Sequence, residues 1–342
     1  MNIALDATYS LGRNLSGVGV YCRRLLWGLA EGHPESRFTF CYRPHRLGRS
    51  LRETLPRNAR RALLLPLLTP RADLFHALNQ RVPPATVRRL AVTFHDLFVI
   101  SGGYSTPEFR ARIAAQSREA AARADLIIAV SAFTARQVEE LLGVDGSRIR
   151  VVPHGVDPPP AAPVPAARQP VVLHVGAIQK RKNLLRLIEA FARLPEPWRL
   201  VLAGAGGFEA EAVYRAARSG SVAERVEFPG YVDAARLEEL YARASVFAFP
   251  SLDEGFGIPV LEAMARGVPV LTSRGSALAE VAGSAALLVN PHSTEEIAAG
   301  LLRLCADEGL RAVLAARGLE RVKLFPWKAA IEKTWTVYRE LL

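Results

Sequence analysis

The chain has 342 residues, half of them apolar, with four Trp, eight Tyr and fourteen Phe, and its formal net charge is +11. This length predicts two domains, and the apolar and aromatic content excludes a disordered chain. The apolar runs fall far short of the ~20 residues that cross a bilayer, and three widely spaced cysteines argue against a disulfide framework or a zinc site.

Strand-like and helix-like patterns alternate through the first half of the chain. Short apolar runs predict buried strands, and apolar positions three or four residues apart predict helices. The expected strands are 2–6, 39–42, 74–76, 91–94, 126–130 and 148–152. Helices are expected from Gly17, over 107–123 and over 132–142, the last of them capped by Ser131.

A proline-rich segment divides the chain. Residues 153–170 contain seven prolines, which do not fit a long helix or an inner strand. The alternation then restarts, with strands expected at 171–175, 200–203, 226–228, 246–249 and 268–271, and helices between and after them. We therefore expect domains over 1–165 and 166–325, each a doubly wound sheet of parallel strands. Ligands bind such sheets at the carboxyl ends of strands, so we expect a site where the two sheets face each other.

The most informative segment follows the strand that ends at Phe249. It holds two acids, Glu254 and Glu262, and two glycines, Gly255 and Gly257, around the start of a helix. Glycines at a helix start let backbone N–H groups approach an anion, which the helix dipole also favours. An anion flanked by carboxylates that accept hydroxyl hydrogen bonds fits a sugar diphosphate with its ribose. The alternative is a capped helix that carries a surface acid.

Three consecutive cations, Lys180, Arg181 and Lys182, follow another strand directly before a helix. Arginine binds phosphate oxygens with two hydrogen bonds and lysine adds a point charge, so such a pair would neutralise a departing diphosphate without a metal. The sequence contains no Asp-x-Asp, no His-x-x-x-His and no cysteine cluster, and we expect no metal site. A solvated run of charges is the alternative.

Together these segments resemble the retaining glycosyltransferases of family 4, often called group 1 transferases, which have the two-domain GT-B fold. The Glu-x7-Glu motif of that family is matched by Glu254 and Glu262, and the resemblance implies that they contact the donor sugar hydroxyls and the ribose. The family's Arg-Lys pair is matched by Arg181 and Lys182, which would hold the diphosphate. Many members carry an arginine where this chain has Ala177, so that contact is missing or supplied elsewhere.

The likeness covers almost the whole chain. Residues 16–21 resemble the family's N-terminal glycine loop, which faces the diphosphate, and His95 matches the strand-end histidine that approaches the donor sugar. A structural role is the alternative for His95, and it is the role that we expect for His76. The helix at about 326–342 resembles the tail that packs back on the N-terminal domain. The residues implied to bind the donor are Gly17, Gly19, Gly176, Tyr231, Val232, Ser251, Gly255, Phe256, Gly257 and Glu262, and those implied in catalysis are His95, Arg181, Lys182 and Glu254.

The resemblance implies that a hexose moves from a nucleoside diphosphate sugar to a glycan or lipid-linked acceptor, with retention of the anomeric configuration and without a cofactor. GDP-mannose is the favoured donor, because the Arg-Lys-Asn form is common in O-antigen and exopolysaccharide mannosyltransferases. A sugar-nucleotide epimerase, which can share the two-domain fold, is the alternative enzyme, although the two glutamates and the Arg-Lys pair argue against it. An NAD-dependent oxidoreductase does not fit, because the glycine loop at 17–22 lacks a third glycine.

The positive charge is concentrated in the first half of the chain. Residues 1–170 hold 23 Arg and 13 acidic residues, and over Arg43–Leu68 arginines alternate with leucines. For this segment we expect contact with an anionic membrane, the leucines dipping into its interface, and the alternatives are a phosphorylated substrate and a solvated basic face. A basic nucleic-acid-binding module is not expected, because the aromatic stacking pattern of a single-strand binder is missing. Without a signal-peptide layout after Met1, we expect a cytoplasmic protein, peripheral at the inner face of the cell membrane.

Overall fold

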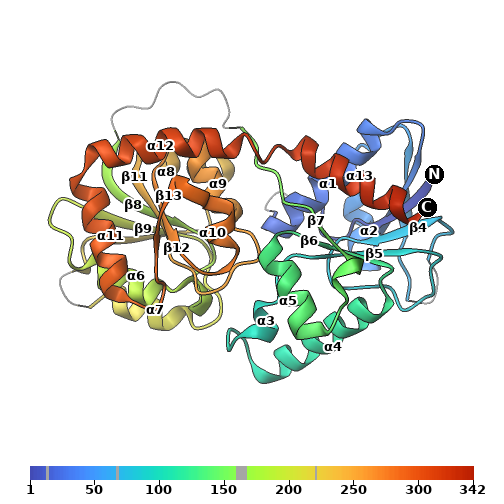
Figure 1. The fold of residues 1–342 in the computed structure, drawn as a ribbon, viewed down its shortest axis with the longest axis horizontal. Coiled ribbons are helices and arrows are strands. Elements are labelled where there is room, and N and C mark those ends of the chain that lie inside the picture. The colour runs from blue at the N-terminus through green and yellow to red at the C-terminus, as the bar shows by residue number, and fades with distance from the viewer. Residues whose placement is uncertain (13–14, 67–68, 159–167, 220–221) are drawn as a thin grey trace. The chain divides into compact units, whose positions relative to one another are not determined.

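The computed structural model describes all residues except 13–14, 67–68, 159–167 and 220–221. The described residues form two compact units, one made of 1–155 and 325–342 and the other of 156–324. Each unit is a sheet with helices packed against it (Figure 1). The domain boundary expected at 165–166 lies outside the described residues, as does half of the proline-rich segment.

The N-terminal unit is built on a seven-stranded parallel sheet in the order β3-β2-β1-β4-β5-β6-β7. The chain adds β2 and β3 on one side of β1 and the later strands on the other, so the strand order reverses between β1 and β4. The strands are β1 (Asn2–Asp6), β2 (Arg37–Tyr42), β3 (Ala59–Leu63), β4 (Leu74–Ala77), β5 (Leu90–Phe94), β6 (Leu126–Ala129) and β7 (Ile149–Val151). The helices are α1 (Gly17–Gly32), α2 (Pro44–Ser50), α3 (Phe98–Ser101), α4 (Pro107–Arg123), α5 (Ala132–Leu142) and α13 (Trp327–Leu341).

Alternate side chains of β1 build the two cores of this unit. Ile3 and Leu5 pack on the face covered by α1 and α13, whereas Ala4 packs on the opposite face. The hydroxyl of Tyr338 on α13 lies 2.6 Å from Nδ1 of His76 on β4. The other ring nitrogen of His76 lies 2.9 Å from the Thr93 hydroxyl, and the ring is fully buried. His76 therefore links the C-terminal helix to the sheet, which agrees with the structural role expected for it.

The C-terminal unit is built on a six-stranded parallel sheet in the order β10-β9-β8-β11-β12-β13. Its strands are β8 (Gln169–Val175), β9 (Arg199–Ala203), β10 (Val226–Gly230), β11 (Ala244–Phe249), β12 (Val270–Ser273) and β13 (Ala286–Val289). Its helices are α6 (Leu184–Phe191), α7 (Ala210–Ala217), α8 (Ala234–Arg243), α9 (Ile258–Ala265), α10 (Ser276–Ala282), α11 (Thr294–Ala306) and α12 (Glu308–Val322). The order reverses between β8 and β11, which pair although β9 and β10 lie between them in the chain. The segments that follow β8 and β11 are thereby neighbours.

The segment Arg43–Leu68 differs from its prediction. It contains α2 and the edge strand β3, which was missed because two consecutive arginines interrupt the apolar pattern of that strand. Leu47 and Leu55 pack against the core of the N-terminal unit, and Leu64 is 3% exposed. Leu64 is therefore buried and Leu47 and Leu55 are half-buried against the core, which contradicts the expectation that these three dip into a membrane. Leu51 is 69% exposed, and for it the expectation stays a prediction.

Candidate active site

A loop containing glycines and acids joins the carboxyl end of β11 to the start of α9. Gly257, the last residue of the loop, has φ of 104°, and a Cβ there would lie 2.5 Å from Leu278 Cδ2. Glycine is therefore required by both conformation and space. Pro259 occupies the first turn of α9, where it removes no intrahelical hydrogen bond.

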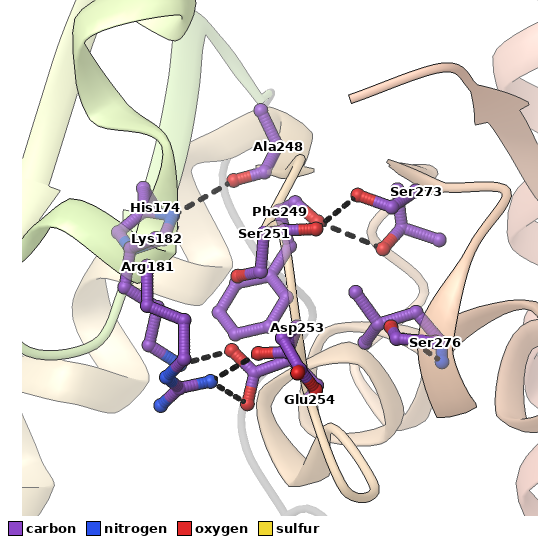
Figure 2. Close-up of polar contacts among 12 residues, drawn as sticks. His174, Arg181, Lys182, Ala248, Phe249, Ser251, Asp253, Glu254, Ser273 and Ser276 are labelled. Carbon is purple, nitrogen blue, oxygen red and sulfur yellow. Dashed lines mark hydrogen bonds and ion pairs between the residues drawn. The ribbon is translucent and has the colours of Figure 1, made fainter. Parts of the chain in front are cut away.

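Side chains of β12 hold the beginning of this loop. The Thr272 hydroxyl donates to the Phe249 carbonyl at 2.8 Å, and the Ser273 hydroxyl donates to the Ser251 carbonyl at 2.6 Å (Figure 2). All the loop residues predicted to bind the donor are buried: Ser251, Gly255, Phe256 and Gly257. These hydrogen bonds hold the start of the loop against the carboxyl end of β12.

The cationic segment is a single turn of 3-10 helix, Lys180–Lys182, that follows β8. Asn183 ends the turn at φ of 61°, and its side-chain amide donates to the Pro250 carbonyl at 3.0 Å. The backbone N–H of Leu252 donates to the Arg181 carbonyl at 2.9 Å. These two bonds tie the cationic turn to the acidic loop across the switch point of the sheet.

Glu254 is the centre of a buried cluster of ion pairs (Figure 2). Its Oε2 lies 2.7 Å from Arg181 Nη1, and its Oε1 lies 2.5 Å from Lys182 Nζ. The three residues are each 7–8% exposed. Arg181 also donates to the backbone carbonyl of Asp253. The structure thus brings together three residues that the sequence placed near a diphosphate, and it adds a direct pairing between cations and carboxylate that was not predicted.

The two cations set the charge state of Glu254. Burial is the largest single influence and opposes ionisation, but the charges and hydrogen bonds of Arg181 and Lys182 together lower the pKa of the carboxyl to about 2. The carboxylate is therefore ionised at neutral pH, and the cluster of three groups keeps one net positive charge. That charge, held away from bulk water, suits the binding of an anion.

His174 belongs to this cluster, although it was not predicted. Its ring stacks on Phe249 with centroids 5.2 Å apart, and Lys182 Nζ lies 4.5 Å from the same Phe249 centroid. Nδ1 of His174 donates to the Ala248 carbonyl at 3.0 Å (Figure 2). Burial, with the nearby Lys182 charge, lowers the pKa of His174 to about 3, so the ring is neutral. The sequence feature that could have identified His174 is its position at a strand end, two residues before Gly176.

Glycines let the backbone after β8 approach that after β9. A Cβ on Gly204 would lie only 1.9 Å from the carbonyl oxygen of Gly176. A Cβ on Gly176 would lie 3.4 Å from Lys182 Cε and from His174 Nε2. The close approach therefore sets the path of the chain into the cationic turn.

Glu262 on α9 makes its own contacts. Its Oε2 accepts a hydrogen bond from the Tyr241 hydroxyl at 3.1 Å, and Arg266 donates to its backbone carbonyl at 2.9 Å. Burial raises the pKa of its carboxyl. Tyr231 and Val232, which the resemblance implies to bind the donor, follow β10, and Tyr231 is 55% exposed. Glu262 thus offers a half-buried carboxyl that a tyrosine orients, which suits contact with a hydroxyl group.

In the N-terminal unit, His95 follows β5 and is buried among other rings. Its Nε2 donates to the Leu78 carbonyl at 2.8 Å, and its Nδ1 lies 3.3 Å from Nε2 of His154. The ring of Tyr21 meets it edge-on with centroids 4.8 Å apart. Burial lowers the pKa of His95 to about 4, so its imidazole is neutral at physiological pH. A hydrogen-bonding role toward the donor sugar stays a prediction, and transfer of a proton from an imidazolium does not fit this environment.

The N-terminal glycine loop forms the start of α1. The Ser16 hydroxyl accepts from the Gly19 N–H at 3.3 Å and caps the helix. Gly17 is the first helical residue and is exposed, whereas a Cβ on Gly19 would lie 3.0 Å from the Tyr9 carbonyl oxygen. Two of the first three residues of α1 therefore carry no side chain, which leaves room for a phosphate to approach the backbone N–H groups.

Two family profiles divide the chain between them. Residues 15–159 match Glycosyltransferase Family 4, and residues 160–321 match glycosyl transferases group 1. An Escherichia coli protein named O-antigen chain mannosyltransferase B is 32% identical over 284 residues, covering 78% of this chain and 74% of that protein. A D-inositol 3-phosphate glycosyltransferase from Kineococcus radiotolerans is 33% identical over 248 residues, covering 63% of this chain and 57% of that protein.

Solved structures share the fold. Sucrose-phosphate synthase from Thermosynechococcus elongatus superposes with a TM-score of 0.81 at 22% identity, covering 100% of this chain and 99% of that one. Anabaena HepE in complex with UDP and glucose gives 0.75 at 18% identity, with 99% of each chain covered. At these identities the likeness establishes the fold, and it confirms the GT-B class predicted from the sequence, with its two parallel-sheet α/β units.

Proposed function

This chain belongs to the group 1 glycosyltransferases of family 4, and from that premise we propose that it moves a hexose from a nucleoside diphosphate sugar to a glycan or lipid-linked acceptor, with retention of configuration. Glycosyl transfer follows from membership of the family. The diphosphate leaving group of the donor rests on one observation above all, which is the buried cluster of Arg181, Lys182 and Glu254 beside the start of α9.

The cluster suits a leaving group whose negative charge grows during the reaction. Arg181 and Lys182 share Glu254, and a bound diphosphate would take over part of their hydrogen bonding. When the bond from the anomeric carbon to the phosphate oxygen breaks, charge appears on that oxygen and the cations stabilise it more strongly than in the ground state. Glu254 then has a lone pair available for a hydroxyl of the sugar.

Retention requires the acceptor oxygen to arrive on the face that the diphosphate leaves. A covalent route would need a carboxylate nucleophile. Glu254 is poorly suited to that role, because two cations hold it and lower its pKa to about 2. We therefore propose attack from the front face through an oxocarbenium-like transition state, in which the departing phosphate oxygen takes the proton of the acceptor hydroxyl.

GDP-mannose is the donor that we propose, because the Escherichia coli relative is named as a mannosyltransferase. The test is calorimetric titration of the full chain with a panel of UDP- and GDP-sugars, followed by NMR of the anomeric product. Tightest binding of GDP-mannose with an α-linked product from the α-donor is the expected result. Tighter binding of a UDP-sugar would show that this sugar nucleotide, and not GDP-mannose, is the donor. Release of an epimerised sugar nucleotide without acceptor, or binding of no sugar nucleotide, would overturn the proposal.

Activity is expected to survive excess EDTA. Arg181, Lys182 and the start of α9 supply the positive field that a divalent metal supplies to phosphate groups elsewhere. Among the residues that the structure describes, no group of three or more His, Cys, Asp or Glu side chains is arranged to hold a metal ion. Turnover before and after EDTA, with magnesium or manganese added back, checks this. Loss with EDTA and recovery with either metal would show that a metal takes part.

A peripheral contact with an anionic membrane is proposed through arginines of the segment Arg43–Leu68, without its buried leucines. Arg49 and Arg52 are exposed, and each cation near such a surface contributes on the order of 1 kcal/mol. Arg61 is unsuitable as a test, because its side chain donates to the carbonyls of Ser50 and Glu53. None of the helices that the structure describes is both long and apolar enough to span a bilayer.

The chain is expected to sediment with anionic vesicles but not with neutral ones. Because the attraction is electrostatic, salt should weaken it, and so should the double substitution Arg49→Gln with Arg52→Gln. Co-sedimentation at two salt concentrations is the measurement. Equal sedimentation with both kinds of vesicle would contradict the proposed contact with an anionic membrane. It would leave the transferase assignment intact.

A further inference from the structure

A pocket of about 410 Å³ lies at the carboxyl ends of the first strands of the N-terminal unit. Arg43 follows β2, residues 64–66 follow β3, residues 81–84 follow β4, and Gln116 of α4 forms a facing wall. The strand order of this sheet reverses between β1 and β4. Doubly wound sheets bind ligands at such a reversal, so the pocket lies where this class of sheet binds its ligands.

The charge of this pocket is positive. Two arginines, Arg43 and Arg81, line it together with one acid, Glu119. Glu119 is already paired with Arg123, one turn further along α4, at 2.9 Å. The two arginines are therefore not neutralised by the acid beside them, and the pocket attracts anions.

Arg43 has hydrogen bonds left to make. Its Nη2 lies 3.6 Å from Oδ2 of Asp6 at the end of β1, beyond the 2.7–2.9 Å of a charge-assisted hydrogen bond. Within the described part of the chain, Nε and Nη2 of Arg43 and Oδ2 of Asp6 are buried and have no hydrogen-bond partner. Unmade bonds of this kind are costly. An anion in the pocket would complete those of Arg43 after a small movement of its side chain.

Arg81 lines the same pocket and brings a second cation to it. Its backbone N–H donates to the Asn79 side chain at 2.7 Å, which fixes the turn after β4. Its charge acts on the Asp6 carboxyl, as does that of Arg43. Burial is the stronger influence and raises the pKa of Asp6. Arg43 and Arg81 therefore line one pocket, and the charges of both act on the carboxyl at the end of β1.

The other walls of the pocket are apolar. Leu64, Pro66, Val82 and Pro84 surround the two cations. A bare inorganic ion would leave these side chains unused, whereas an anionic group carried on a larger organic body would cover them. All four belong to loops that contain proline, which restricts the backbone before the ligand binds.

We propose that this pocket binds a phosphate group of the acceptor, with Arg43 and Arg81 as its ligands. The proposal rests on the proposed function, since it names the chemical class of the second substrate. It also gives a role to part of the positive charge that the first half of the chain carries. Phosphate of this kind is found both on lipid carriers and on soluble sugars, and the experiment separates these two sources.

The experiment is calorimetric titration of the full chain with octyl phosphate below its micelle concentration, with glycerol phosphate, and with neutral octyl glucoside. Octyl phosphate is expected to bind and octyl glucoside is not. Arg43→Gln or Arg81→Gln should weaken octyl phosphate about tenfold or more, because each removes a charge-assisted pair of hydrogen bonds. Tighter binding of octyl phosphate than of glycerol phosphate indicates a lipid-linked acceptor, and equal binding indicates a soluble phosphorylated one.

Two control variants make the outcome decisive. Arg49→Gln removes an exposed cation of the same basic segment outside the pocket, and it should change the octyl phosphate affinity less than twofold. Lys182→Gln removes one of the two cations of the diphosphate site proposed in the C-terminal unit. The proposal would be overturned if Lys182→Gln abolished the binding of octyl phosphate while Arg81→Gln left it intact. Equal binding of octyl phosphate and octyl glucoside would also overturn it. If Arg43→Gln unfolds the chain by leaving Asp6 unpaired, the Arg81→Gln variant still tests the proposal, because Arg81 is exposed. None of these titrations requires sugar transfer, so a failure of the proposed function is seen separately.

Discussion

Alanine in place of Arg181 or of Lys182 is expected to remove roughly 2–4 kcal/mol of transition-state stabilisation, a loss of about 30- to 800-fold in kcat/KM. Each substitution deletes a buried cation that pairs with Glu254, at 2.7 Å for Arg181 and 2.5 Å for Lys182. The fold should tolerate either change, because Glu254 keeps the other cation. The loss should fall mainly on kcat, since the charge on the diphosphate grows as the glycosidic bond breaks.

Lys180→Ala is the matched control for these variants. Lys180 belongs to the same 3-10 turn, but its side chain is 47% exposed and pairs with exposed Glu209 at 3.1 Å. An exposed pair of this kind contributes little, so turnover should stay within about twofold. Near-normal kcat/KM in both Arg181→Ala and Lys182→Ala would show that the cluster is structural. A loss as large in Lys180→Ala would point to a general effect of charge.

Elements with strong local signals could be predicted from the sequence. The helix expected over 132–142 is present as α5, and Ser131 caps it by accepting the Thr134 N–H at 3.0 Å. A capping hydroxyl and the αL glycine at 143 act within one turn of the helix, so the sequence alone carries both signals. The edge strand β3 was missed because no comparable local signal marks it. Its arginines are tolerated by the open edge of a sheet, which depends on tertiary context.

Three members of the buried cluster, Arg181, Lys182 and Glu254, could be named from the sequence, but neither His174 nor the contacts among them could. Both segments were placed at strand ends, because strand-to-helix transitions are visible in the local pattern. The pairing of Lys182 with Glu254 joins residues 72 positions apart, and it depends on the neighbouring positions of β8 and β11 in the sheet. Likewise, Arg43 meets Asp6 only because β2 lies beside β1. Strand order is a property of the whole sheet, and no local pattern encodes it.

Gly204→Ala is expected to destabilise the C-terminal unit by about 3 kcal/mol or more. The new Cβ would lie 1.9 Å from the carbonyl oxygen of Gly176 and 2.6 Å from its carbonyl carbon. Both are backbone atoms, so no side chain can move away to make room. Gly204 also has φ of 157°, a backbone conformation that residues with a side chain rarely adopt. Urea unfolding followed by tryptophan fluorescence measures the change.

Gly309→Ala is the control that separates this steric effect from a general response to an added methyl group. Gly309 lies in the first turn of α12, in the same unit, and a Cβ there would meet only Asp307 Oδ1, at 3.4 Å. Alanine favours a helix over glycine, so that variant should be neutral or more stable. If Gly204→Ala unfolds at the same urea concentration as the parent chain, the close approach of the two loops is not needed for stability. If it folds but binds GDP and UDP weakly, the approach instead serves to place Gly176, and with it the path of the chain toward Arg181 and Lys182.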